Sequence, residues 1–105
     1  DLRLSRGLGD VYKRQVLEFY INQLNEENFD FVFYIAGVDI HRNDRLGKLK
    51  ISDEGIRKRD EMVTKNFFSQ GVPLCGVLGG GYNKDFNKLV ELHSFLHQSC
   101  AKLLK

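Results

Sequence analysis

The chain has 105 residues, of which 42% are hydrophobic and 29% charged, so it has the size of one small domain and the composition of a folded protein. Sixteen Lys and Arg residues against 14 Asp and Glu residues give a formal net charge of +2. Residues 1–15 hold four of the cations and two of the anions, which leaves 12 of each sign in residues 16–105. Nucleic-acid binding needs a clustered basic excess, so this charge pattern argues against direct contact with nucleic acid.

The sequence also bears on the cellular compartment. Two cysteines, Cys75 and Cys100, are too few to staple a secreted domain of this size, and they fit a reducing compartment or at most one optional bridge. Residues 1–15 lack the apolar core and cleavage site of a signal peptide, and no apolar run is long enough to span a membrane. We therefore expect a cytoplasmic protein without a membrane partner, or a nuclear one in a eukaryotic cell.

Residues 1–15 differ in character from the rest of the chain. They contain two glycines and four cations without a sustained amphipathic period, and the pattern changes sharply at Val16. The string GLGDVYKRQ, from Gly7 to Gln15, resembles the translation of the transposon-end adaptor used in sequencing libraries. We predict that residues 1–15 are adaptor-derived and that residues 16–105 are the C-terminal portion of a longer domain. A natural flexible loop is the alternative.

The first half of the chain predicts a helix, a strand and a loop. Apolar residues at three- and four-residue spacing predict an amphipathic helix over residues 16–25. A nearly continuous apolar run, rich in β-branched and aromatic side chains, predicts a strand over residues 29–36 that is covered on both faces. A long polar loop is expected over residues 37–50.

The second half predicts a helix, a strand and a further helix. Ser52, followed by two acidic residues, is typical of a helix start, and this helix is expected to end near Gly71. A short apolar strand follows over residues 72–78, and the last helix begins near Asp85. Two strands joined by a helix predict a βαβ unit with parallel strands and a right-handed crossover. The fold class is therefore α/β.

Functional sites in open parallel sheets gather at the carboxyl ends of the strands. Three consecutive glycines, Gly79 to Gly81, follow the second strand and allow a close backbone approach to another chain or a ligand. They would present Tyr82 at the rim of the sheet. A tight turn with Tyr82 packed on the surface is the alternative, since the glycines do not form a phosphate-binding loop.

The histidines do not form a complete metal site by spacing alone. Asp39 and His41 stand two residues apart and could reach one metal ion, but a zinc site needs three protein ligands. His93 and His97 are four residues apart on the last helix, where we interpret them as surface residues. Cys75 lies within a predicted apolar strand and is interpreted as an inert buried thiol.

An ordered set of motifs between about Asp30 and Tyr82 resembles the histone deacetylase superfamily, closest to its class IV and bacterial deacetylase-like branch. The motifs are Ala36-Gly-Val-Asp39, Asn43-Asp-Arg-Leu-Gly47, Ser52-x-Glu-Gly55, Arg59-Asp60 and Gly79-Gly-Gly-Tyr82. The resemblance implies the C-terminal part of a three-layer α/β/α (arginase/deacetylase-like) domain with a mostly parallel sheet. It also implies a zinc-dependent deacetylase that hydrolyses an N-acetyl amide.

The resemblance assigns roles to five residues. Asp39 matches a metal ligand of the family, and Tyr82 matches the tyrosine that polarises the acetyl carbonyl and stabilises the oxyanion. Leu46, Gly80 and Gly81 match positions that line the acyl-lysine channel. Zn²⁺ is the expected cofactor, with Fe²⁺ as the alternative, since one carboxylate does not distinguish the two metals.

The family's tandem histidines and its Asp-x-His ligands have no counterpart in this chain, so we expect the chain alone to be inactive. Its expected substrate is an acetylated lysine of a protein or a small acetylated amine. The alternatives are an acetylpolyamine or other small-molecule amidohydrolase of the same family, and a non-catalytic α/β interaction module. Because both strands are apolar on two faces, residues 16–105 expressed alone should be poorly soluble or molten.

Overall fold

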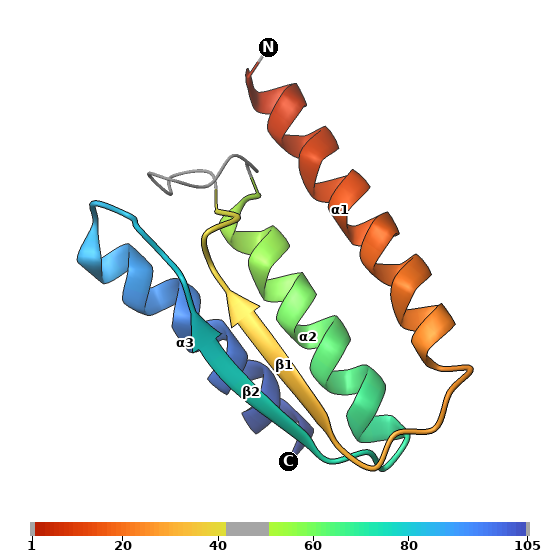
Figure 1. The fold of residues 1–105 in the computed structure, drawn as a ribbon. Helices are drawn as coiled ribbons and strands as arrows, with labels where there is room; N and C mark the ends of the chain where they lie inside the picture. Colours follow the sequence, from red (N-terminus) through yellow and green to blue (C-terminus); the bar gives the residue numbers. More distant parts are fainter. Residues whose placement is uncertain (1, 42–50, 105) are drawn as a thin grey trace.

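The computed structural model describes residues 2–41 and 51–104, which form three helices and two strands. In chain order these are α1 (Leu2–Leu24), β1 (Val32–Gly37), α2 (Asp53–Ser69), β2 (Leu74–Gly79) and α3 (Phe86–Leu103). The strands pair in parallel, in a register that runs from Val32 opposite Leu74 to Gly37 opposite Gly79. Helix α2 makes a right-handed crossover behind them (Figure 1). The predicted α/β class and βαβ unit are confirmed.

Side-chain caps start α2 and α3 at the predicted positions. The Ser52 hydroxyl accepts a hydrogen bond from the Gly55 amide at 3.1 Å, and two acidic residues follow in the first turn of α2. The Asp85 carboxylate accepts a hydrogen bond from the Lys88 amide at 3.2 Å at the start of α3. These caps satisfy amides that have no partner within their own helix, which fixes where each helix begins.

Helix α1 begins at Leu2, so the predicted start at Val16 was wrong. Asp10 connects this early part of the helix to the start of α2, because its carboxylate accepts hydrogen bonds from the Ser52 hydroxyl and, at 2.9 Å, from the Ser52 amide. Residues 42 positions apart form this contact, so the spacing of apolar residues around Asp10 could not predict it. The adaptor origin of residues 1–15 stays a prediction. No described helix combines the length and apolarity that a membrane crossing requires.

The buried core lies between the helices and one face of the sheet. Gly76 permits the approach of α3 to β2, since a β-carbon there would lie 2.7 Å from Leu96 Cδ2. Helix α1 packs alongside α2 and closes the second cluster (Figure 1). The buried members are Val38, Ile51, Ile56, Leu92 and Phe95 in the first cluster and Ile21, Val63 and Phe67 in the second.

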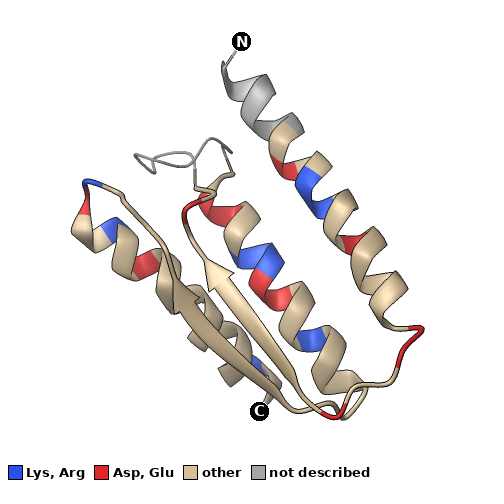
Figure 2. Ribbon diagram, viewed as in Figure 1, with Lys and Arg blue, Asp and Glu red and all other residues tan. Residues whose placement is uncertain are grey.

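The opposite face of the sheet is exposed. In β1, Phe33 and Ile35 are 71% and 74% exposed, and their partners in β2 are Cys75 and Val77. We call these four residues and Phe31 the open sheet face. In the described part of the chain, helices cover one face only, and the strands carry no charged residue (Figures 1 and 2). The prediction of a buried Cys75 thiol was wrong, because that thiol lies on the uncovered face.

Candidate functional site

The two strands end side by side, and both following loops leave from the same edge of the sheet. The Val38 amide donates to the Gly79 carbonyl at 3.2 Å, which extends the pairing beyond the last register position. The Asp39 side chain lies against both strand ends. A β-carbon at Gly80 would lie 3.3 Å from Asp39 Cγ, and one at Gly37 would lie 3.2 Å from Asp39 Oδ1. Asp39 itself is exposed. The sequence-predicted Asp39 and Gly80 are therefore neighbours.

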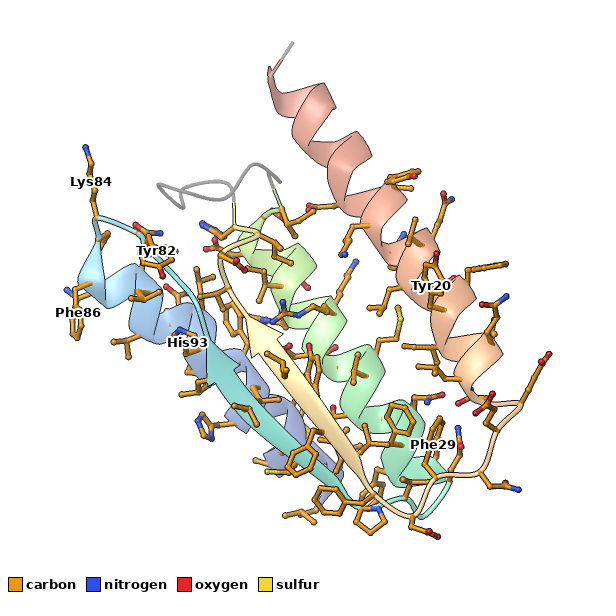
Figure 3. All side chains as sticks on the ribbon, viewed as in Figure 1. Tyr20, Phe29, Tyr82, Lys84, Phe86 and His93 are labelled. Carbon is orange, nitrogen blue, oxygen red and sulfur yellow. The ribbon has the colours of Figure 1, made fainter. Side chains whose placement is uncertain are left out.

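Gly80 and Gly81 turn the chain through backbone conformations that favour glycine, with φ values of +63° and +108°. Gly81 also has no room for a side chain, because a β-carbon there would lie 2.5 Å from Leu89 Cδ1 and 2.9 Å from Val38 Cγ2. The next residue, Tyr82, is 52% exposed at the rim (Figure 3). The glycines thus press the loop onto the core and direct the chain outward at Tyr82.

A cavity of about 380 Å³ adjoins Asp39 at the end of the sheet. Tyr82 is not among its lining residues, and the fifth predicted site residue, Leu46, lies outside the described residues. The cavity is lined by Lys13, Leu17, Tyr34, Ile35, Gly37, Asp39, Ile40, Arg59, Val63, Gly79 and Gly80.

A buried polar network holds the strand side of the Asp39 loop. Arg59 of α2 donates from Nη1 to the Gly37 carbonyl at 2.5 Å and from Nε to Asp60 Oδ1 at 3.1 Å. The Tyr34 hydroxyl donates to the same Asp60 oxygen at 2.5 Å, and Asp60 is only 1% exposed. Burial raises the pKa of Tyr34; the Arg59 charge opposes that rise and the Asp60 charge adds to it. The Asp60 charge is thereby paired, and the backbone before Asp39 is fixed.

A second network holds the other side of the same loop. His41 is 1% exposed, and its Nε2 lies 2.5 Å from Asp53 Oδ1. Lys88 Nζ donates to Asp53 Oδ2 at 2.6 Å and to Glu91 at 3.1 Å. Burial alone would raise the pKa of Asp53, but the hydrogen bonds from Lys88 and His41 outweigh it and lower that pKa. The Asp53 carboxylate is therefore ionised at neutral pH and accepts hydrogen bonds from Lys88 Nζ and His41 Nε2.

The described residues do not assemble a metal site by themselves. No group of three His, Cys, Asp or Glu side chains in residues 2–41 and 51–104 is close enough to hold an ion. Asp39 offers one carboxylate. His97 is exposed, as predicted, whereas His93 is half-buried, with its Nε2 3.5 Å from where a β-carbon of Gly81 would lie. The His93 ring therefore lies against the glycine turn.

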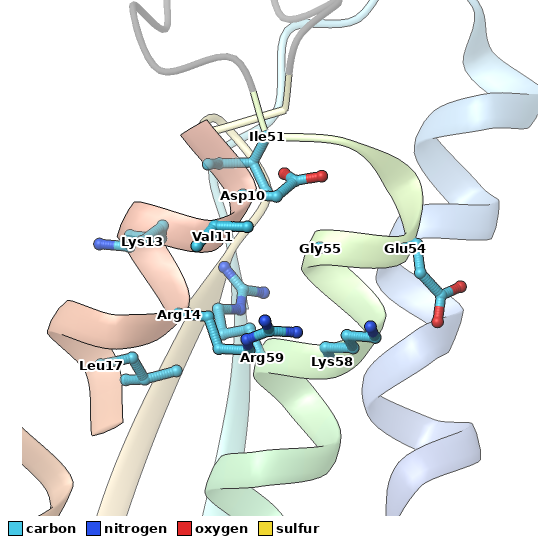
Figure 4. A pocket seen from close by; sticks show the side chains of 10 residues that line it. All are labelled: Asp10, Val11, Lys13, Arg14, Leu17, Ile51, Glu54, Gly55, Lys58 and Arg59. Atoms are coloured by element: carbon cyan, nitrogen blue, oxygen red, sulfur yellow. The ribbon is translucent and has the colours of Figure 1, made fainter. Parts of the chain in front are cut away.

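A second pocket of about 320 Å³ lies between α1 and α2 and shares Lys13, Leu17 and Arg59 with the cavity beside Asp39 (Figure 4). Four cations, Lys13, Arg14, Lys58 and Arg59, share its lining with two acids, Asp10 and Glu54. It contains none of the five site residues predicted from the sequence. Its charges reflect the packing of two polar helix surfaces.

Sequence reasoning missed the side chains that hold the Asp39 loop. The adjacent Arg59 and Asp60 stood in the motif set without a role, and Tyr34 was counted among strand aromatics. Asp53 was interpreted only as an acid at a helix start. The Tyr34 hydroxyl, within an otherwise apolar strand, was a local signal that a buried polar partner such as Asp60 lies beside the strand.

Comparisons with known proteins agree on one family. The family model described as "Histone deacetylase domain" matches residues 1–95. An uncharacterized protein of Picosynechococcus is 41% identical over 100 residues, which cover 94% of this chain and 33% of that protein. "Histone deacetylase 2" of Arabidopsis thaliana is 38% identical over 89 residues, which cover 77% of this chain and 23% of that protein. The chain thus spans a third or less of these relatives.

Proposed function

The chain belongs to the histone deacetylase domain family, and on that premise we propose that it forms part of the active site of a metal-dependent hydrolase that removes the acetyl group from N-acetyl-lysine. Since the chain spans a third or less of its relatives, the activity is proposed for the longer protein that contains it, called the parent below. We propose that the 105 residues alone are inactive, and that the parent works in the cytoplasm or, in a eukaryote, the nucleus.

One observation carries the proposal. Asp39 lies against Gly80 at the joined carboxyl ends of two parallel strands, and Tyr82 leaves the same glycine turn two residues later. Asp39 and Tyr82 thereby lie in the two loops that leave one edge of the sheet, although they are 43 positions apart in sequence. The edge at which parallel strands end is where α/β domains hold their ligands.

The donor set fits one position of a zinc site. Asp39 would supply one carboxylate oxygen, and further ligands would come from outside the described residues, which contain no cluster of three candidate ligands. Bound Zn²⁺, or Fe²⁺ as the alternative, polarises an amide carbonyl and lowers the pKa of a metal-bound water. Tyr82 would donate a hydrogen bond from its hydroxyl to the developing oxyanion. The backbone of Gly80 and Gly81 would form part of the wall of the acyl channel.

The test uses the parent, recovered by a long sequencing read of the source DNA across the codons for Gln15 and Val16. The zinc-loaded parent should hydrolyse an acetyl-lysine peptide, and Tyr82→Phe should lower kcat about 10²- to 10³-fold, the usual cost of one oxyanion donor. Tyr20→Phe is the matched control, because Tyr20 is 58% exposed on α1 and remote from the strand ends.

The outcomes separate the alternatives. Hydrolysis of an acetylated polyamine in preference to the peptide would assign a small-molecule substrate to the same site. A folded, zinc-loaded parent that cleaves neither substrate would refute the proposal and favour the interaction module. Equal effects of Tyr82→Phe and Tyr20→Phe would remove Tyr82 from the reaction.

A further inference from the structure

Three side chains form a continuous line of contacts across the end of the sheet. His41 stands two residues after Asp39, in the loop that leaves β1. Asp53 is the first residue of α2, and Lys88 lies in the first turn of α3, six residues after Tyr82. His41 Nε2 and Lys88 Nζ approach the two oxygens of Asp53 at 2.5 and 2.6 Å. The line therefore joins the loop that leaves β1 to the first turn of α3, the helix that follows the Tyr82 loop, through the start of α2.

We propose that the His41–Asp53–Lys88 line sets the position of Asp39 relative to Tyr82, so that all three are positioning residues of the site. This inference rests on the proposed deacetylase function. It assigns no metal contact to His41, whose Nε2 contacts the Asp53 carboxylate.

Rigidity of the Asp39 loop supports this role. The His41 amide donates to the Val38 carbonyl at 3.1 Å, which closes a tight turn around Asp39. The His41 ring is buried, and a buried polar ring holds its place only where its hydrogen bonds are satisfied. Because both Asp53 oxygens are engaged, the carboxylate has no free rotamer to follow a moving loop. The turn and the Asp53 contact therefore both oppose movement of the loop that carries Asp39.

The two networks hold opposite sides of the loop. Arg59 binds the Gly37 carbonyl on the strand side, and His41 binds Asp53 on the far side. Between these anchors, Asp39 is exposed and lies against Gly80. Because its loop is held from both sides, Asp39 can bind a charged group without the conformational-entropy cost of ordering that loop.

The experiment compares two lysines in the parent. Lys88→Met cuts the line at its outer end, and Asp53→Asn removes its central charge. Lys102→Met is the matched control, because Lys102 also joins α3 to α2, through Glu61 at 2.9 Å, but stands at the opposite end of α3 from Lys88. The measurements are Zn²⁺ affinity by competition with a chromophoric chelator, kcat and KM on an acetyl-lysine peptide, and the thermal midpoint.

Asp53→Asn should weaken Zn²⁺ binding about 10- to 100-fold, as loss of an outer partner of a metal site does, and lower kcat with KM nearly unchanged. Lys88→Met should act in the same direction by about 10-fold or less. Lys102→Met should change neither quantity. In an Asp39→Asn background, Asp53→Asn should cause no further loss of Zn²⁺ affinity, since the line acts through Asp39.

Each result decides the inference. Normal Zn²⁺ affinity and kcat in Asp53→Asn, with a lower thermal midpoint, would reduce the line to a structural role, and additive losses with Asp39→Asn would do the same. If Asp53→Asn does not fold, Lys88→Met against Lys102→Met decides. A parent that binds Zn²⁺ but does not deacetylate refutes the function while the affinity comparison still tests the line. A parent without Zn²⁺ binding overturns both.

Discussion

The open sheet face should make the 105-residue chain self-associate, and Phe33→Thr combined with Ile35→Thr should reverse this. These two positions are 71% and 74% exposed, while Phe31 and Val77 on the same face are 50% and 39% exposed. Threonine keeps a high strand propensity, so the substitutions remove apolar area without removing the preference for β1. The strands carry no charge that would oppose edge or face pairing.

The exposed fractions set the size of the effect. Full burial of a Val, Ile or Phe side chain contributes about 1.5–3 kcal/mol, so the four side chains leave about 4–7 kcal/mol of burial unused. A whole domain is stable by only about 5–15 kcal/mol. Phe33 and Ile35 account for about 2–4 kcal/mol of the unused burial. Association through this face recovers part of that energy, and the double substitution removes more than half of the burial energy that association could recover.

The assay measures molar mass by light scattering and surface apolarity by ANS fluorescence. The unsubstituted chain should elute above its monomer mass of 12.1 kDa and bind ANS, whereas the double variant should shift toward monomer with weaker ANS fluorescence. Phe86→Thr is the matched control, because Phe86 is 73% exposed but lies at the start of α3. It should change nothing.

Two results would refute this reasoning. The first is an unsubstituted chain that is monomeric, binds no ANS and melts in one sharp transition. The second is an equal response of Phe33→Thr and Phe86→Thr, since exposed aromatic area in general would then control association.

Three further predictions concern the parent. Gly81→Ala should destabilise it by about 2–4 kcal/mol in urea unfolding, because its β-carbon would lie 2.5 Å from a leucine methyl at φ +108°; Gly71→Ala, at φ +71° with nothing within 4 Å, should cost less. Tyr34→Phe should lower the free energy of unfolding by about 1.5–3 kcal/mol, since buried Asp60 loses a charge-assisted hydrogen bond. The pKa of Asp53 in the folded parent is lowered below its unfolded value of about 3.9. The ionised carboxylate therefore stabilises the fold above that pH, and this contribution is lost as the pH falls through the folded pKa. The thermal midpoint at acid pH should therefore fall less steeply in Asp53→Asn than in the unsubstituted parent.

Local chemistry made most of the fold predictable. Ser52 and Asp85 cap their helices where predicted, because a cap depends on side chains within three residues of it. The strand expected over residues 29–36 is observed at 32–37, and its partner at 74–79 rather than 72–78. Both shifts lie at strand ends, where pairing rather than propensity decides. The parallel pairing itself followed from the intervening helix.

Contacts between elements were beyond the sequence. Asp53 looks like any acid in a first helical turn, and only the folded chain brings His41 and Lys88 to its two oxygens. Asp39 and Gly80 could be placed at one edge of the sheet from topology, but their contact depends on a glycine turn of particular φ values. The exposure of Cys75 could not be predicted either, because an apolar strand sequence does not indicate which face of the sheet is covered by helices.

The open face and the incomplete ligand set of the proposed metal site can be traced to the same feature of the sheet. Among the described residues the sheet has two strands, and Asp39 stands at the end of one of them with a single carboxylate to offer. A segment of the parent that covered the open face or paired beside β1 would extend the edge at which further ligands stand. Phe33→Thr should then have opposite effects, shifting the isolated chain toward monomer but destabilising the parent by about 1–2 kcal/mol. A higher free energy of unfolding of the parent on Phe33→Thr would mean that this face is exposed in the parent as well. Further ligands of the proposed metal would then have to reach Asp39 from the helix side of the sheet.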